Sequence, residues 1–191
     1  MIVSMGWPNV LTWLRIIIIP LVIITFYLPF AWAHYFAAVL FAIACLTDWL
    51  DGFLARKLKQ FSSFGAFFDP VADKLLVSAA LLLLVGSPDL HFITLPAIVI
   101  VGREIVISAL REWMAELGQR TSMAVSYIAK IKTTLQMVAI TLLLAFHQNE
   151  TWYGLLGVVL LYVAAILTIW SMIEYLKIAW PELTKKSNVM P

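Results

Sequence analysis

Charged residues are scarce in this sequence. Asp, Glu, Lys and Arg make up 13% of its 191 residues and hydrophobic residues 63%, whereas soluble globular domains carry about 25% charged residues. This balance argues against a water-soluble domain and favours a membrane environment. The formal net charge of +2 is too small to indicate a nucleic-acid partner.

Cysteine and histidine are also rare. The only cysteine, Cys45, excludes an internal disulfide and a cysteine metal cluster. The three histidines are His34, His91 and His147, and all fall near the expected outer side of the membrane, away from the acidic residues discussed below. We therefore expect no histidine metal site.

No stretch rich in Pro, Gly or Ser separates a second domain, whereas long apolar runs recur throughout. A helix needs about 20 apolar residues to cross a bilayer. The six runs of about this length cover residues 10–30, 33–53, 64–85, 92–110, 127–146 and 152–172. Ala31-Trp32-Ala33 resembles a signal-peptidase site, but we interpret the first run as a retained helix. The expected architecture is an all-α integral membrane bundle of six transmembrane helices, forming a single domain over residues 1–191.

The basic residues predict the orientation of this bundle, because Lys and Arg accumulate in cytoplasmic loops. They cluster after the second run, between the fourth and fifth runs and at the end of the chain: Arg56, Lys57, Lys59, Arg111, Arg120, Lys130, Lys132, Lys177, Lys185 and Lys186. The segments 30–34, 86–92 and 147–152 contain none. Both termini are therefore expected in the cytoplasm.

Four aspartates stand out because acids within membrane segments usually mark functional sites. Asp48 and Asp51 lie near the end of the second run, and Asp69 and Asp73 near the start of the third. Residues three or four apart share a helix face, so two carboxylate pairs can face each other across a short turn. Such carboxylates would repel unless cations neutralised them. Their hard oxygens favour Mg²⁺ or Mn²⁺, and two such ions suit a phosphoryl displacement.

Small and basic residues accompany the aspartates. Gly52 and Ala55 lie on the aspartate side of the second helix, and Gly65 opens the third. They would let a bulky ligand approach the backbone, although small residues also permit close helix packing. Arg56 could grip a diphosphate or serve only as a positive charge at a cytoplasmic helix end.

Together these positions spell D-x-x-D-G-x-x-A-R, eight residues, then G-x-x-x-D-x-x-x-D, and the chain thereby resembles the CDP-alcohol phosphotransferase family. The resemblance implies six transmembrane helices, often in a homodimer, with a site open to the cytoplasm. It implies that the four aspartates bind two metal ions, with Asp73 also the catalytic base. The residues implied to bind the CDP-activated lipid are Asp51, Gly52, Ala55, Arg56 and Gly65.

Three further stretches are similar to those of the bacterial branch of this family that uses glycerol 3-phosphate as acceptor. They are residues 8–15, 103–112 and 130–136. This similarity implies that CDP-diacylglycerol and sn-glycerol 3-phosphate give phosphatidylglycerophosphate and CMP. It also implies a multi-pass enzyme of the bacterial inner membrane, in contact with membrane lipids.

An anionic acceptor is also expected on physical grounds. Arg103 and Arg111 lie eight residues apart, about 80° around and roughly 12 Å along one helix, so they share a broad face. With Lys130, and with Ser108 as a hydrogen-bonding group, they could receive the phosphate of glycerol 3-phosphate. The alternative is that both arginines pair with nearby acids of the same helix: Glu104, Glu112 and Glu116.

Two charged residues elsewhere remain open to more than one interpretation. Arg15 could bind a lipid phosphate or balance an aspartate. Lys74, next to Asp73, is interpreted as a charge partner rather than a catalyst.

Three other functions are weighed against this one. A membrane prenyltransferase also uses aspartates and Mg²⁺ but does not predict the Gly, Ala-Arg and Gly positions. An ion transporter would need acids across the whole membrane, whereas these acids cluster toward one side. Within the family, an inositol-phosphate or serine acceptor is the main alternative, because the motif does not specify the acceptor.

Overall fold

A computed structural model describes residues 7–58, 63–88, 90, 92–117, 127–146 and 151–184. Within helices, only the backbone is described for residues 7–11, 49, 51–58, 63–67, 127–130 and 182.

The described residues form six α-helices and no strand. In chain order the helices are α1 (Trp7–Phe26), α2 (Ala33–Leu58), α3 (Ser63–Val85), α4 (Thr94–Glu116), α5 (Tyr127–Ala145) and α6 (Trp152–Thr184). Each coincides with one of the six apolar runs, so the expected all-α bundle of six helices is confirmed. The largest difference is at the C-terminal end of α6, which the apolar run placed near residue 172. Apolar runs locate the hydrophobic part of a helix, and α6 continues beyond it as a more polar segment.

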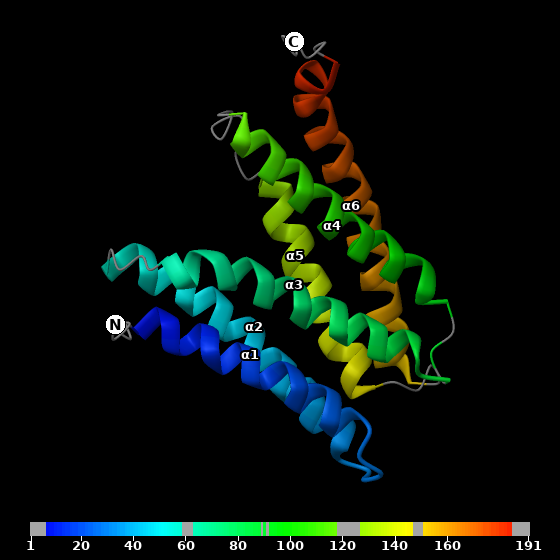
Figure 1. The fold of residues 1–191 in the computed structure, drawn as a ribbon. Helices are drawn as coiled ribbons and strands as arrows, with labels where there is room; N and C mark the ends of the chain where they lie inside the picture. The colour runs from blue at the N-terminus through cyan, green and yellow to red at the C-terminus, as the bar shows by residue number, and fades with distance from the viewer. Residues whose placement is uncertain are drawn as a thin grey trace.

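Two groups of helices build the bundle, as Figure 1 shows. In one group α1 packs against both α2 and α3, and in the other α6 packs against both α4 and α5. The contact between α2 and α5 joins the groups. From the connection at residues 86–93, α3 and α4 diverge (Figure 1). The end of α2, the start of α3 and the end of α4 therefore lie where the bundle is most open.

The main core is apolar and lies where the two groups meet. Its fully buried members include Phe41 of α2, Leu84 of α3 and Ile140 of α5. Packing is tightest between α5 and α6, where a Cβ added to Gly157 would come within 2.9 Å of Leu143 Cγ. The glycine therefore permits a close approach of these two helices.

The opposite end of the bundle is rich in aromatic side chains. Phe30 stacks on Trp32 between α1 and α2, and Phe146 stacks on Tyr153 between α5 and α6. At the same end Phe92 has a φ of 70°, a conformation uncommon for residues other than glycine. Its carbonyl oxygen accepts a hydrogen bond from the Tyr162 hydroxyl of α6 at 2.6 Å. The α3–α4 connection is thus fastened to α6.

One helix within the described ranges is long and apolar enough to cross a membrane by length and composition alone, at Trp152–Pro181 of α6. Shorter apolar helical stretches occur in α1, α2 and α5.

Candidate active site

Two side chains of helix α1 bond to two of the four aspartates, which lie on α2 and α3. Thr12 and Arg15, one turn apart on one face of α1, are both completely buried. Thr12 Oγ1 donates a hydrogen bond to Asp69 Oδ1 of α3 at 2.5 Å, and Arg15 Nη2 lies 3.0 Å from Asp48 Oδ1 of α2. Of the two roles considered for Arg15, the structure thus confirms that it balances an aspartate.

Asp73 connects the aspartates of α2 and α3 with helix α4. Its charge interacts with those of Asp48 and Glu104, and Asp48 also interacts with Asp69. Next to Asp73, Lys74 Nζ donates a hydrogen bond to Ser108 Oγ of α4. Asp48 of α2 thus lies within electrostatic range of Asp69 and Asp73 of α3, and Asp73 lies within range of Glu104 of α4.

The residue types of this cluster are those that a hard divalent cation prefers, and Arg15 and Lys74 are the cations that interact with Asp48 or Asp73 among the described side chains. Carboxylate oxygens are the usual ligands of Mg²⁺ and Mn²⁺. Among the described side chains, no group of three or more His, Cys, Asp or Glu residues has a geometry that could hold a metal ion. The fourth predicted ligand, Asp51, has its side chain outside the described part.

A second charged cluster joins α4 to α5. Glu104 Oε1 lies 2.9 Å from Arg103 Nη1 and 3.0 Å from Lys132 Nζ. Arg103 is 7% exposed and Lys132 is 2% exposed, so one partly buried carboxylate holds two buried cations. Arg103 Nε has no hydrogen-bond partner among the described atoms.

Helix α6 completes this cluster with two residues one turn apart. Ser171 Oγ accepts a long hydrogen bond of 3.4 Å from Arg103 Nη2, and the Tyr175 hydroxyl accepts one of 2.9 Å from Arg111 Nη2. The guanidinium carbons of Arg103 and Arg111 lie 5.6 and 5.0 Å from the centre of the Tyr175 ring. Helices α4, α5 and α6 thus bring together Arg103 and Lys132, which pair with Glu104, and Arg111, which bonds to Tyr175.

Several predicted site residues lie where only the backbone is described. Asp51, Gly52, Ala55 and Arg56 belong to the last turns of α2, Gly65 to the first turn of α3 and Lys130 to the first turn of α5. Their helical positions agree with the expected ones. Their side chains lie outside the described part of the chain.

The structure also separates the interpretations of the basic residues. Arg103 pairs with Glu104, as the structural alternative expected, while Arg111 bonds to Tyr175 instead of Glu112 or Glu116. Ser108 accepts its hydrogen bond from Lys74.

Sequence reasoning assigned no role in the site to Thr12, Lys132, Ser171 or Tyr175. Lys132 is a charge within an apolar run, which is the signal that singled out Arg103 and could have found it. Tyr175 lies beyond the expected end of its helix and carried no signal of its own.

Comparison with known proteins places these residues in a family. A sequence model described as CDP-alcohol phosphatidyltransferase matches residues 5–170. The chain is 53% identical over 176 residues to the CDP-diacylglycerol–glycerol-3-phosphate 3-phosphatidyltransferase of Salmonella choleraesuis (strain SC-B67). It is 51% identical over 176 residues to the protein of the same name from Escherichia coli (strain K12). Both alignments cover 92% of this chain and 96% of the relative.

Proposed function

Because the chain belongs to the CDP-alcohol phosphatidyltransferase family, we propose that it transfers the phosphatidyl group of CDP-diacylglycerol to sn-glycerol 3-phosphate. The products are phosphatidylglycerophosphate and CMP, so the protein acts as a phosphatidylglycerophosphate synthase in anionic phospholipid synthesis. The relatives that match over nearly their whole length carry this activity in their names.

The observation that carries the proposal is an acidic half and a basic half of the site that are linked across α3 and α4. Asp48, Asp69 and Asp73 form the acidic half, and the cations around Glu104 form the basic half. The Lys74–Ser108 hydrogen bond crosses from α3 to α4 between them. A metal-bound diphosphate fits the acidic half, and the phosphate of the acceptor fits the basic half.

The reaction is a displacement at the lipid-linked phosphorus. The free hydroxyl of glycerol 3-phosphate forms a new oxygen–phosphorus bond, the bond from that phosphorus to the CMP oxygen breaks, and CMP leaves. Asp73 takes the hydroxyl proton, since a general base must lie within hydrogen-bonding reach of the proton it accepts. Arg103, Ser108, Arg111 and Lys130 hold the acceptor phosphate, so that the hydroxyl points toward Asp73.

The activated lipid binds at the other half of the site. Asp51, Gly52, Ala55 and Gly65 line the pocket for the cytidine, and Arg56 holds the diphosphate. The four motif aspartates, Asp48, Asp51, Asp69 and Asp73, would hold two divalent ions, Mg²⁺ or Mn²⁺. When bound, they neutralise the charge that develops on the attacking and leaving oxygens.

An acceptor competition tests the proposed reaction. Purified protein in detergent is given CDP-diacylglycerol, Mg²⁺ and equal concentrations of glycerol 3-phosphate, serine and inositol phosphate, and the lipid products are separated. We expect phosphatidylglycerophosphate to dominate and its formation to stop when a chelator removes the metal. A dominant serine or inositol product would refute glycerol 3-phosphate as the acceptor. Turnover that survives chelation would refute the proposed metal requirement.

The surface supports placement of the six helices within a bilayer. Large apolar side chains are exposed along the outer faces of different helices, among them Ile17, Leu82, Ile98 and Ile166. Soluble monomers rarely expose contiguous apolar patches larger than a few hundred Å². The aromatic end of the bundle fits one membrane interface, and the aspartate end then faces the cytoplasm. The location is the bacterial inner membrane.

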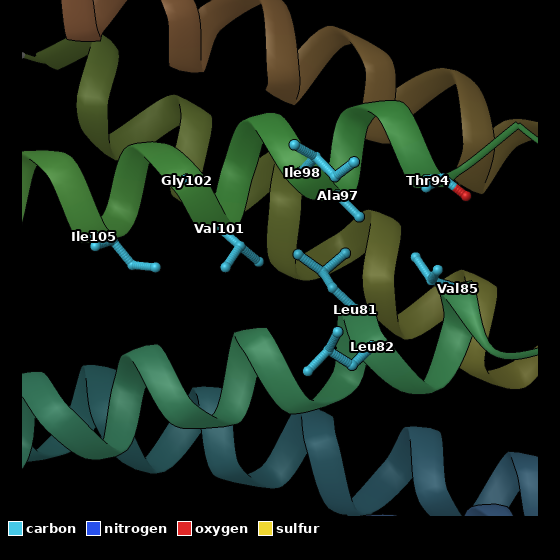
Figure 2. A pocket seen from close by; sticks show the side chains of 9 residues that line it. All are labelled: Leu81, Leu82, Val85, Thr94, Ala97, Ile98, Val101, Gly102 and Ile105. Atoms are coloured by element: carbon cyan, nitrogen blue, oxygen red, sulfur yellow. The ribbon is translucent and has the colours of Figure 1, made fainter.

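A homodimer is part of the proposal, and an apolar groove between α3 and α4 is its candidate contact. Figure 2 shows Leu81 and Val85 of α3 and Val101 and Ile105 of α4 among the side chains around it. The groove has a volume of about 290 Å³. In a Cys45→Ala background, Ile98→Cys should cross-link two copies in native membranes. Reaction with a lipid-borne probe, without cross-linking, would instead assign the groove to an acyl chain.

A further inference from the structure

Tyr175 of α6 is a buried residue that the proposed chemistry does not use. It is 4% exposed and lies in a small core with Ile107 and Leu110 of α4. Its hydroxyl is nonetheless bonded to Arg111, and both guanidinium groups of α4 lie near its ring. Phe or Leu could fill an apolar core of this size. Packing alone therefore does not explain why a tyrosine, with its hydroxyl on Arg111 and its ring near two arginines, occupies this position.

The charges around Tyr175 do not balance within the described cluster. Arg103, Arg111 and Lys132 carry three positive charges, whereas Glu104 is the one acid bonded to them. Among the described side chains bonded together here, positive charges outnumber the negative charge by two, and a phosphate monoester at neutral pH carries nearly two negative charges. The cluster fits one such phosphate.

We propose that Tyr175 is a positioning residue that holds Arg103 and Arg111 in the orientation that receives the phosphate of the acceptor. This inference rests on the proposed function, because it concerns the acceptor of that same reaction. Tyr175 does not touch the reacting atoms and acts only through the two arginines.

The physical reason is pre-organisation. Two guanidinium groups repel each other and, on long side chains, lose considerable rotamer freedom when a ligand fixes them. Arg111 is exposed, so it would sample many rotamers without a partner. The Tyr175 ring attracts both cations through its π face, and the hydroxyl fixes the plane of Arg111 by a hydrogen bond. Glu104, which also pairs with Lys132, restrains Arg103 through an ion pair.

The test separates the hydroxyl from the ring. Tyr175→Phe removes only the hydrogen bond, and Tyr175→Leu removes the ring face as well. Because Tyr175→Phe removes a hydrogen bond to a charged group, we expect it to raise the KM for glycerol 3-phosphate by roughly tenfold or more. The KM for CDP-diacylglycerol and kcat should change by less than about twofold. Tyr175→Leu should have a larger effect in the same direction.

The matched control is Tyr162→Phe, which also removes a tyrosine hydroxyl hydrogen bond of α6, but at the aromatic end of the bundle. It should leave both KM values unchanged. A second measurement is inhibition by inorganic phosphate, which should weaken in Tyr175→Phe by the same factor as the acceptor KM. A double-mutant cycle with Arg111→Gln should be strongly non-additive if Tyr175 acts through Arg111.

The outcomes distinguish this inference from the proposed function. If the wild-type protein does not use glycerol 3-phosphate, the proposed function fails. If the wild type uses it but Tyr175→Phe keeps its KM, or raises both KM values equally, the positioning role is overturned. If both Tyr175 variants lose the fold, measured as lost helix content, Arg111→Lys takes their place, because it keeps the positive charge but removes the planar group that the Tyr175 hydroxyl and ring contact. A wild-type KM for glycerol 3-phosphate in Arg111→Lys would then overturn the inference.

Discussion

Arg15 is a fully buried cation whose one ion pair is with Asp48. Its Nε and Nη1 atoms have no hydrogen-bond partner among the described residues. Removing one partner of a buried ion pair leaves an uncompensated charge and costs about 3 to 5 kcal/mol, and less here because the Asp48 side chain is 36% exposed. Arg15 therefore neutralises Asp48, a task that the proposed metal would share.

We predict that Arg15→Ala lowers the thermal unfolding temperature most strongly in a chelator. Added Mg²⁺ should then restore more stability than it adds to the wild type, because the metal takes over the neutralisation of Asp48. Thermal unfolding with and without Mg²⁺ measures this difference. Lys177→Ala, at an exposed position of α6, is the control. Equal unfolding temperatures for Arg15→Ala and the wild type in chelator would contradict the prediction.

Asp73 has the proposed role of proton acceptor. Asp73→Asn keeps the size of the side chain but cannot take a proton, and general base catalysis typically contributes about 10²- to 10⁴-fold. We expect kcat to fall by at least that factor while circular dichroism shows unchanged helix content. Glu112→Gln, an exposed change on α4, should keep wild-type turnover. Wild-type kinetics in Asp73→Asn would refute the role.

Arg103→Ala tests the basic half of the site in the same way. Because Arg103, paired with Glu104, is proposed to bind the acceptor phosphate, its loss should raise the KM for glycerol 3-phosphate much more than that for CDP-diacylglycerol. Steady-state kinetics with each substrate varied in turn measure both constants. A change confined to CDP-diacylglycerol would place Arg103 on the other half of the site.

At the scale of helices, the closest packing is between α5 and α6 at Gly157. A Cβ there would lie 2.9 Å from Leu143 Cγ and 3.0 Å from Leu143 Cδ2. Overpacking of this kind typically lowers the free energy of unfolding by about 1 to 3 kcal/mol. Replacing a helical glycine by alanine raises it by up to about 1 kcal/mol through higher helix propensity. We therefore expect Gly157→Ala to be neutral to destabilising.

A compensating change tests the cause. Leu143→Ala alone should destabilise by about 2 to 5 kcal/mol because it opens a cavity. The double variant Leu143→Ala/Gly157→Ala should lose less stability than the sum of the losses of the two single variants, since the new methyl group occupies part of the cavity. Chemical denaturation of the three variants gives the comparison, and strict additivity would show that the two sites do not meet.

Helix ends were the least predictable part of each element. The apolar run ended near residue 172, whereas α6 continues to Thr184. The reason is that hydropathy reports the surroundings of a segment, while a helix also continues through polar residues that satisfy its backbone hydrogen bonds. Tyr175 lies in that continuation, and hydropathy alone could not indicate it.

At the scale of the whole molecule, the proposed six membrane crossings would leave five loops, three on the outer side and two in the cytoplasm together with both termini. In a Cys45→Ala background, Trp32→Cys should react with a membrane-impermeant maleimide in intact cells. Leu117→Cys and Leu183→Cys, at the ends of α4 and α6, should react only after the cells are opened. Labelling of Trp32→Cys and Leu117→Cys on the same side would rule out the six-span topology.

By itself, the sequence determined the number of helices and the placing of acids at the end of α2 and the start of α3. Apolar runs and residues three or four apart are local patterns, and they require no knowledge of which helices are neighbours. Only the tertiary structure decided that Arg15 pairs with Asp48, that Lys132 shares Glu104 with Arg103, and that Tyr175 holds Arg111. These partners lie on different helices, and their contacts depend on how α1, α5 and α6 pack, which no local pattern encodes.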